Sequence, residues 1–200
     1  MQVNKQSLWQ MHKKKFSLKD YHSSFVSLLN LNKEIESKIN LFCNLLKKTN
    51  KNKGKVVLFG NGGSASIASH VATDLIKNAK IMALCFNEPS HITCLANDYG
   101  YHKWIEKSIE FHCDKKDLVI LISSSGASAN MLEAAKFCTQ KKIKLVTFTG
   151  KNSLNKLKLI NSKGLNFWSN SYAYNHIELT HLFWLLCTVD KIIGKSVYRA

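Results

Sequence analysis

The stretch KVVLFGNGGSAS, residues 55–66, decides the fold, because a short apolar run ends there in a glycine-rich turn that leads into a helical pattern. Four further apolar runs follow, and each precedes a segment of helical period. Strands that alternate with helices in this way predict an α/β fold, a three-layer αβα sandwich with a five-stranded, mostly parallel sheet. The other predicted strands span residues 81–86, 117–122, 144–149 and 164–168, and the predicted helices span about 64–79, 99–112, 127–141 and 172–193.

The 200 residues, 45% of them hydrophobic, suit one compact domain. Within it we expect an N-terminal extension over residues 1–16 and a helical segment over 17–53. The sheet core and the C-terminal helix then occupy residues 54–194. In the helical segment, apolar residues recur at steps of three and four, and Ser17 with Asp20 three residues later is a plausible helix start.

The chain is strongly basic, with 29 Lys+Arg against 13 Asp+Glu and a formal net charge of +16. A charge of this size is typical of nucleic-acid-binding proteins, but nearly all of it is lysine, and the lysine clusters are not interleaved with aromatic residues. We therefore expect a solvated surface rather than a nucleic-acid site. DNA affinity that falls steeply with salt would contradict this expectation.

The six cysteines form no CxxC pair, which favours a reducing compartment. The N-terminus has no apolar block of signal-peptide length, and no apolar stretch approaches the length of a membrane span. The sequence thus predicts a cytoplasmic protein without a membrane partner.

Two strand-to-helix turns are candidates for binding an anion, because glycines and a helix N-terminus expose backbone amides and hydroxyls add neutral donors. The alternatives are a glycine-rich turn without a ligand and a helix capped by one serine with the others solvated. The pattern does not predict a Walker-type loop, since no glycine-lysine-serine/threonine step is present. The first turn contains Asn61, Gly62, Gly63 and Ser64, and the second contains Ser123, Ser124, Ser125 and Ser128.

Side-chain spacing suggests a metal site on two helices. His70 and Asp74 are four residues apart and share a helix face, and Glu178 and His181, three apart, share another. Two histidines and two carboxylates are a plausible zinc shell. The alternatives are a polar His70 near a helix start and a His181 that is packed or solvent-facing. His91 either touches substrate or is structural.

Three segments in this order resemble the SIS sugar-isomerase family, in its sedoheptulose-7-phosphate isomerase branch: GNGGSASIASHVATDL (60–75), SHITCLANDYG (90–100) and ISSSGASAN (122–130). The resemblance implies an aldose-ketose isomerase that converts sedoheptulose 7-phosphate to D-glycero-D-manno-heptose 7-phosphate through an enediol(ate), for lipopolysaccharide or capsule. It further implies a homotetramer whose N-terminal helices serve in packing and whose sites draw on more than one subunit, with zinc at the site.

The resemblance also assigns roles to individual residues. The four serines of the second turn would hold the sugar phosphate. Asn61, Ser64 and Asp98 would meet sugar hydroxyls, and Asn175 stands where the isomerases usually have an aspartate. By the same resemblance, His70 would be a metal ligand, Asp74 would be ligand and base in place of a glutamate, and Glu178 would replace a glutamine ligand.

The chain departs from the family pattern at two places. Asp74 is one methylene shorter than glutamate, and the family's catalytic histidine would fall at Leu186, which cannot transfer a proton. Either His181 or His176 has taken over, or Glu178 acts with a metal-bound water, or isomerisation is lost. In the last case the protein would be a non-catalytic SIS module that binds a phosphosugar or a protein partner, as the replication-initiator-associating relatives do.

Overall fold

The computed structural model describes residues 15–197 and divides the chain into two compact units, Met1–Asn30 and Leu31–Ala200. The first unit contains helix α2 (Leu18–Leu28), which begins where the sequence predicts: the Ser17 side chain accepts a hydrogen bond from the backbone N–H of Asp20. The expected helical segment 17–53 is thus divided between the two units. The expected extension 1–16 lies almost entirely outside the described residues.

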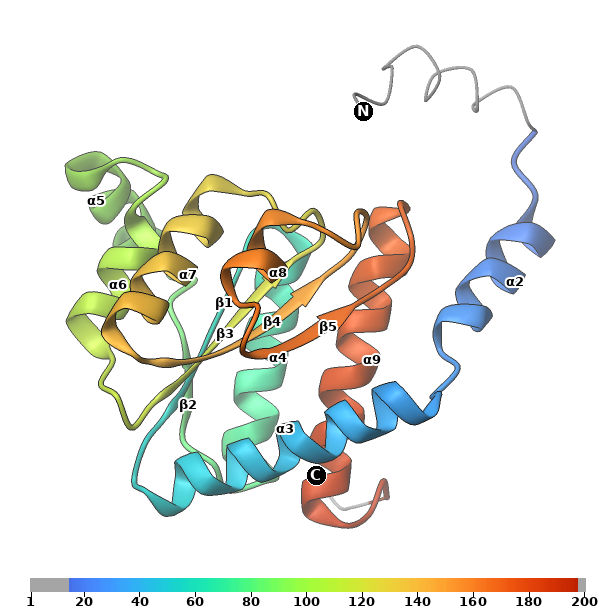
Figure 1. Cartoon of the computed structure of the whole chain (residues 1–200), viewed down its shortest axis with the longest axis horizontal. Coiled ribbons are helices and arrows are strands. Elements are labelled where there is room, and N and C mark those ends of the chain that lie inside the picture. The colour runs from blue at the N-terminus through green and yellow to red at the C-terminus, as the bar shows by residue number, and fades with distance from the viewer. Residues whose placement is uncertain (1–14, 198–200) are drawn as a thin grey trace. The chain divides into compact units, whose positions relative to one another are not determined.

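The second unit is built on a five-stranded sheet of order β2-β1-β3-β4-β5, in which every neighbouring pair is parallel (Figure 1). β1 and β3 are buried along their whole length, in keeping with their continuous apolar sequence. The predicted sheet is confirmed, with boundaries shifted by at most two residues. The strands are β1 (Val56–Gly60), β2 (Ala83–Cys85), β3 (Leu118–Ser123), β4 (Lys144–Thr149) and β5 (Leu165–Trp168).

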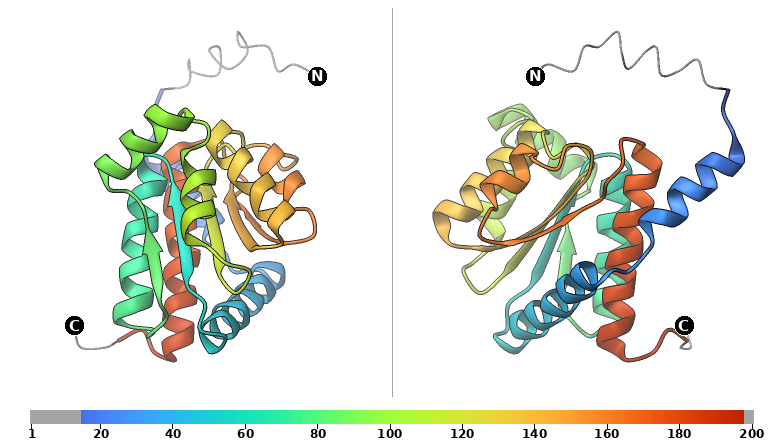
Figure 2. Two further views of the ribbon diagram at one scale, coloured as in Figure 1. Left: turned by 90° about the vertical axis from the view of Figure 1, so that its left-hand side faces the viewer. Right: turned by 45° about the vertical axis from the view of Figure 1, so that its right-hand side comes forward.

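Helices cover both faces of the sheet, which confirms the three layers (Figure 2). Because successive strand residues point to opposite faces, Leu58 packs in one apolar cluster, whereas Val57 and Phe59 pack in the other. The first cluster involves α3 (Lys33–Lys51), α4 (Gly63–Lys77) and α9 (Tyr174–Ile193). The second involves α5 (Pro89–Tyr99), α6 (Trp104–His112), α7 (Ala129–Lys141) and α8 (Lys156–Ile160).

The segment after β2 differs from the expectation. The sequence predicts a loop there and one helix over residues 99–112, whereas the structure has α5 and the shorter α6. Pro89 stands in the first turn of α5, where its missing N–H is harmless, and the Glu88 side chain accepts a hydrogen bond from the N–H of His91. Gly100, with φ of 84°, ends the helix. The short helix α8 is not predicted either.

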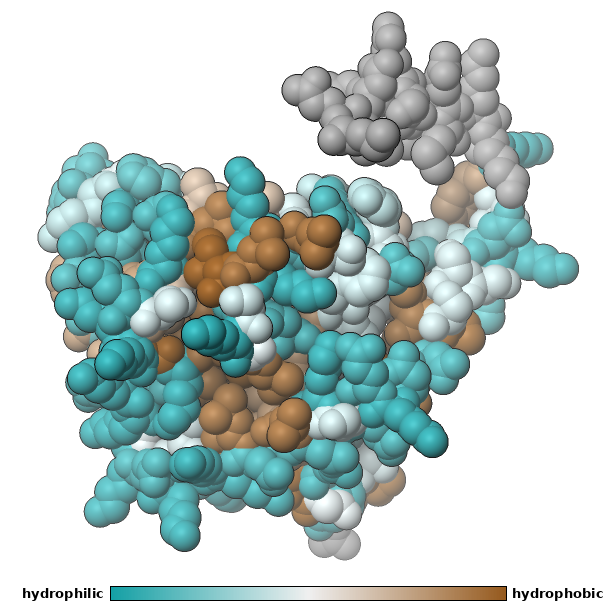
Figure 3. Space-filling view, in the orientation of Figure 1, coloured by the Kyte–Doolittle hydropathy of each residue, from teal (hydrophilic) through white to brown (hydrophobic). Residues whose placement is uncertain are grey.

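Most of the face shown in Figure 3 is hydrophilic, in keeping with the solvated lysine-rich surface that the composition suggests. Over the described part of the chain, no helix combines the length and the apolar character that are needed to cross a membrane.

Candidate functional site

The two glycine- and serine-rich turns lie side by side at the carboxyl end of the sheet. β1 pairs with β3 in parallel, and Gly60 at the end of β1 stands opposite Ile122 near the end of β3. Each strand turns directly into a helix, α4 after β1 and α7 after β3. Loops at the carboxyl ends of adjacent parallel strands form the usual ligand-binding edge of an α/β sheet.

Three helices begin at this edge, and none of them has a side-chain N-cap hydrogen bond. Ser128 is the N-cap residue of α7, yet its hydroxyl makes no capping bond, and Gly62 and Ala173 hold the same position in α4 and α9. Side chains cap α2, α3, α5 and α8, whereas α6, with Lys103 at its N-cap, also has no side-chain cap. An uncapped helix N-terminus has free N–H donors and favours an anion. The interpretation in which a serine caps the second turn is therefore wrong.

The serine loop is fixed by backbone contacts, and its Ser125 Oγ accepts a hydrogen bond from the Ala127 N–H at 3.2 Å. Gly126 has a φ of 59°, its N–H donates to the Ser123 carbonyl at 3.0 Å, and its carbonyl accepts from Leu157 N–H at 2.9 Å. A Cβ at Gly126 would clash with the Asn155 side chain, so only glycine fits this position. Ser124 is 6% exposed, and its Oγ has no hydrogen-bond partner among the described residues.

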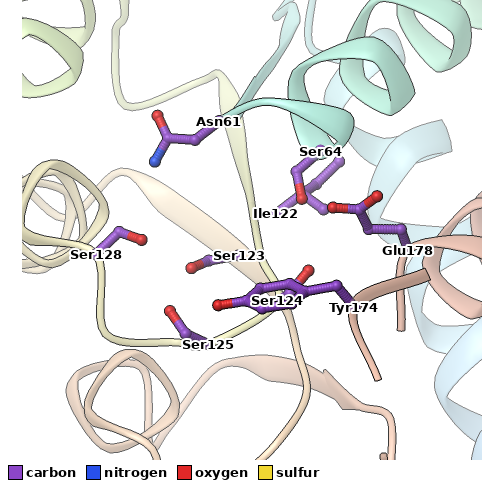
Figure 4. Close-up of a pocket in the computed structure, with 9 residues that line it drawn as sticks. All are labelled: Asn61, Ser64, Ile122, Ser123, Ser124, Ser125, Ser128, Tyr174 and Glu178. Atoms are coloured by element: carbon purple, nitrogen blue, oxygen red, sulfur yellow. The ribbon is translucent and has the colours of Figure 1, made fainter. Parts of the chain in front are cut away.

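A cavity of about 120 Å³ opens between the two turns and the start of α9 (Figure 4). A buried hydroxyl without a partner is unfavourable unless a ligand or water satisfies it, so the Ser124 Oγ points to an occupant that offers hydrogen bonds. The lining holds hydroxyls, an amide and one carboxylate, and no cationic side chain of the described residues. It consists of Asn61, Ser64, Ile122, Ser123, Ser124, Ser125, Ser128, Tyr174 and Glu178.

Glu178 is the carboxylate of this pocket. It projects from the first turns of α9 toward Ser64 and the start of α4 (Figure 4). A Cβ at Gly63 would clash with the Glu178 carboxylate, so the missing side chain of Gly63 makes room for it. Among the described residues Glu178 has no hydrogen-bond or ion-pair partner, which leaves both oxygens available for a ligand or a proton.

Tyr174 forms a second wall of the pocket, and no pattern in the sequence points to it. Tyr174 is 56% exposed, and the centroid of its ring lies 3.7 Å from the ammonium of Lys151. Two hydrogen bonds fix the backbone of Lys151. The Lys151 N–H donates to the Ser171 carbonyl, and the Trp168 indole N–H donates to the Lys151 carbonyl. Lys151 thus contacts the Tyr174 ring without lining the pocket itself.

His70 and Asp74 pair with each other on α4, as their spacing predicts. The His70 Nε2 lies 3.4 Å from Asp74 Oδ2, and Asp74 also accepts a hydrogen bond from the Asn78 side chain. His70 is 53% exposed on its side chain, and neither residue lines the pocket.

His181 is buried in the core beside the sheet. Its Nε2 lies 3.0 Å from the Thr149 carbonyl, and its ring contacts Phe148 edge to face. Burial lowers the pKa of His181 to about 4, opposed by the Thr149 carbonyl, so the imidazole is neutral near pH 7. His181 therefore agrees with the alternative in which it is a packed residue and not a metal ligand.

The remaining predicted site residues lie outside the pocket lining. Asp98 is exposed near the end of α5, where its carboxylate accepts from the Asn97 side chain, and Asn175 is exposed in the first turn of α9. His176 is buried. His91 contacts Ser108 Oγ at 2.7 Å through Nε2 and stacks on Phe86, which agrees with its structural alternative.

The four residues expected to hold zinc do not meet in one chain. No group of three or more His, Cys, Asp and Glu side chains suited to a metal ion occurs among the described residues. His70 and Asp74 form a pair, Glu178 faces the pocket, and His181 faces Thr149. The donor set of a single chain therefore does not fit a zinc shell.

Comparisons with known proteins place these features in context. The model of the SIS domain family matches residues 20–150. The chain is 37% identical over 145 residues to a phosphoheptose isomerase of Cytophaga hutchinsonii, covering 68% of this chain and 75% of that protein. It is 35% identical over 159 residues to one of Sodalis glossinidius, covering 74% and 80%. A solved phosphoheptose isomerase of Francisella tularensis, 24% identical, superposes with a TM-score of 0.77 over 90% of this chain and 100% of that one.

Proposed function

The chain belongs to the SIS domain family, within its phosphoheptose isomerase branch, and we propose that it interconverts sedoheptulose 7-phosphate and D-glycero-D-manno-heptose 7-phosphate. The observation that carries this proposal is the position of Glu178, which faces the serine loop across one pocket. An aldose-ketose isomerase needs a phosphate site and a base at the opposite end of the substrate, and this pocket offers a candidate for each.

The phosphate would bind at the serine loop. Ser123, Ser124, Ser125 and Ser128 surround the pocket at the N-terminus of α7, which has no side-chain cap. Hydroxyls and backbone amides bind a phosphomonoester without a cation, since the helix dipole provides the field. The otherwise unsatisfied Ser124 Oγ would gain an acceptor.

The charge of Glu178 orients the substrate. A carboxylate repels a phosphate dianion, so the phosphate would lie at the serine loop and the first two carbons would lie toward Glu178. Asn61 and Ser64 line the same pocket and would hydrogen bond with the oxygens of these carbons. Gly62, where a Cβ would meet nothing within 4 Å, would let the substrate approach the backbone at the start of α4, and Gly63 would make room for the Glu178 carboxylate.

We propose Glu178 as the general base. It would remove a proton from C1 of the ketose, and the C–H electrons would form the enediol(ate) double bond as the C2 carbonyl oxygen gains charge. Return of the proton to C2, together with transfer of the C1 hydroxyl proton to the C2 oxygen, would leave the carbonyl at C1 and a hydroxyl at C2. The other candidates for proton transfer do not line the pocket: Asp74 pairs with His70, His181 faces the Thr149 carbonyl, and His176 is buried. Leu186 packs against the apolar core.

We also propose that the protein binds zinc, assembles as a homotetramer and acts in the cytoplasm. Because one chain does not assemble a zinc shell, a bound zinc would require ligands from more than one copy, as the resemblance implies for the site; metal analysis of the purified oligomer tests this. The six cysteines are free thiols, which supports a reducing cytoplasm. The product would supply heptose for lipopolysaccharide or capsule.

The substitution Glu178→Gln tests the base directly. It keeps the shape of the side chain and removes its proton affinity, so kcat with sedoheptulose 7-phosphate should fall by about 10²- to 10⁴-fold, while KM stays within threefold or decreases. Glu36→Gln, an exposed position on α3, is the matched control. A Glu178→Gln enzyme that keeps a tenth of the kcat would contradict the assignment. Wild-type protein that binds the sugar phosphate without turnover would support the non-catalytic SIS module instead.

A further inference from the structure

Two asparagines join the two pocket turns through a reciprocal pair of hydrogen bonds. The Asn61 Nδ2 donates to Asn130 Oδ1 at 3.1 Å, and the Asn130 Nδ2 donates to Asn61 Oδ1 at 2.9 Å. Asn61 belongs to the turn after β1 and lines the pocket, whereas Asn130 is 2% exposed in the first turn of α7. The pair thus connects a pocket residue to a buried side chain of the neighbouring turn.

The backbone determines which way this pair faces. The N–H of Met131 donates both to Asn130 Oδ1 and to the Ser128 carbonyl, each at 3.0 Å, and an Asn130 Nδ2 on this side would set two donors against each other. The oxygen of Asn130 must therefore occupy this side, which leaves its nitrogen to face Asn61. Asn61 must in turn place its oxygen opposite that nitrogen and its own nitrogen opposite Asn130 Oδ1. The orientation of Asn61 follows from a single backbone donor.

Tyr101 completes the set of contacts around Asn61. Its hydroxyl, on the segment between α5 and α6, donates to Asn61 Oδ1 at 3.2 Å. With Asn130 and Tyr101 both donating to it, the Asn61 oxygen has used its two lone pairs. One hydrogen of Asn61 Nδ2 is left beyond the bond to Asn130. Figure 4 shows the amide nitrogen of Asn61 on the side of the serine loop and its oxygen on the opposite side.

We propose that Asn130 is a positioning residue that holds Asn61 as a hydrogen-bond donor toward a substrate oxygen, with Tyr101 in a smaller supporting role. This inference rests on the proposed function, since it assigns the substrate to this pocket. A fixed donor selects an oxygen that accepts, above all one with negative charge such as an enediolate or phosphate oxygen. A carboxamide free to rotate would offer its carbonyl equally well and would repel such an oxygen.

The substitution Asn130→Asp tests the orientation with almost no change of shape. One carboxylate oxygen still accepts from Met131 N–H, but the other replaces the donor that faces Asn61 Oδ1, so two acceptors oppose each other. Asn61 would rotate and lose its donor position. We expect kcat/KM to fall by about 10- to 100-fold, the range for losing a hydrogen bond to a charged group. Asn50→Asp, an exposed position with the same change of charge, should stay within twofold of wild type.

A double-mutant cycle separates positioning from general structural damage. If Asn130 acts through Asn61, the variant Asn61→Ala/Asn130→Asp should lose no more kcat/KM than Asn61→Ala alone. Losses that multiply would overturn the proposal, as would an Asn130→Asp enzyme within twofold of wild type. Tyr101→Phe should cost about threefold, consistent with one neutral hydrogen bond of modest strength. Asn130→Ala serves in the cycle if the aspartate variant does not fold.

A calorimetric measurement keeps this proposal separate from the proposed function. The dissociation constant for sedoheptulose 7-phosphate is measured for the same variants, and it requires no turnover. Wild-type protein without isomerase activity would remove the proposed reaction, yet weaker binding by Asn130→Asp, absent from Asn50→Asp, would still support the positioning role. Unchanged binding and unchanged kinetics in Asn130→Asp would overturn it.

Discussion

The two ends of the parallel sheet differ in whether their buried polar groups have hydrogen-bond partners. At the amino end, the fully buried carboxylate of Asp117 accepts hydrogen bonds from the backbone N–H and ammonium of Lys55 and from the N–H of Asp114, at 2.6 to 2.8 Å. At the carboxyl end, Ser124 Oγ is buried without a partner, and three helices begin without a side-chain cap. Polar groups at one end satisfy each other, and those at the other end are left for a ligand.

Asp117→Ala should produce the largest loss of stability and leave the site intact. It removes the acceptor of three hydrogen bonds that fasten the starts of β1 and β3, so the free energy of unfolding should fall by about 3 kcal/mol. KM for the sugar phosphate should not change in the folded protein. Denaturant titration measures the free energy of unfolding, and steady-state kinetics measure KM. Asp114→Ala, which keeps the backbone donor, is the control, and a stability loss below 1 kcal/mol in Asp117→Ala would contradict the comparison.

Gly63→Ala should damage catalysis without damaging stability. The new methyl group would displace the Glu178 carboxylate, and a misplaced base reduces kcat by about 10- to 100-fold. Alanine favours a helix more than glycine does, so the free energy of unfolding should stay equal or rise slightly. The exposed Ser66→Ala, on the same helix turn, should leave kcat unchanged. A normal kcat in Gly63→Ala would show that the position of Glu178 does not limit the reaction.

Ser124→Ala should give the smallest effect and distinguish a hydroxyl kept for a ligand from one that is merely unsatisfied. KM should rise about tenfold through the loss of one charge-assisted hydrogen bond, with no loss of stability. Thr49 Oγ1 is also buried without a partner, but on α3 outside the pocket lining. Thr49→Val should therefore leave KM unchanged. Equal KM values in Ser124→Ala and wild type would remove Ser124 from the phosphate site.

The sequence predicted the turns well because their signals are local. An apolar run, glycines and the start of a helical pattern lie within a dozen residues, and parallel pairing then brings both turns to one edge. The helix α5 was missed because Pro89 and Glu88 act as a helix start in a stretch that resembles a loop. Local signals of this kind suffice for strands and for long helices, and fail for short ones.

The contacts within the site were harder to predict because they join distant parts of the chain. Asn61 and Asn130 are 69 residues apart, and they meet only through the register of β1 on β3. Helical spacing correctly paired His70 with Asp74, since both are on α4. It placed Glu178 and His181 on one helix face, but it could not say that one faces the pocket and the other the Thr149 carbonyl. Orientation of a helix about its axis depends on its packing partners.

The three uncapped helices do not all belong to the same layer. α4 and α9 pack on one face of the sheet and α7 on the other, yet all three begin at the pocket. A bound sugar phosphate would serve as a common N-cap for helices of both layers and so link the apolar cores on the two faces of the sheet. At a substrate concentration a hundred times its dissociation constant, this linkage is worth about 2.7 kcal/mol of folding free energy. The resting enzyme is thus held together less firmly than the working one.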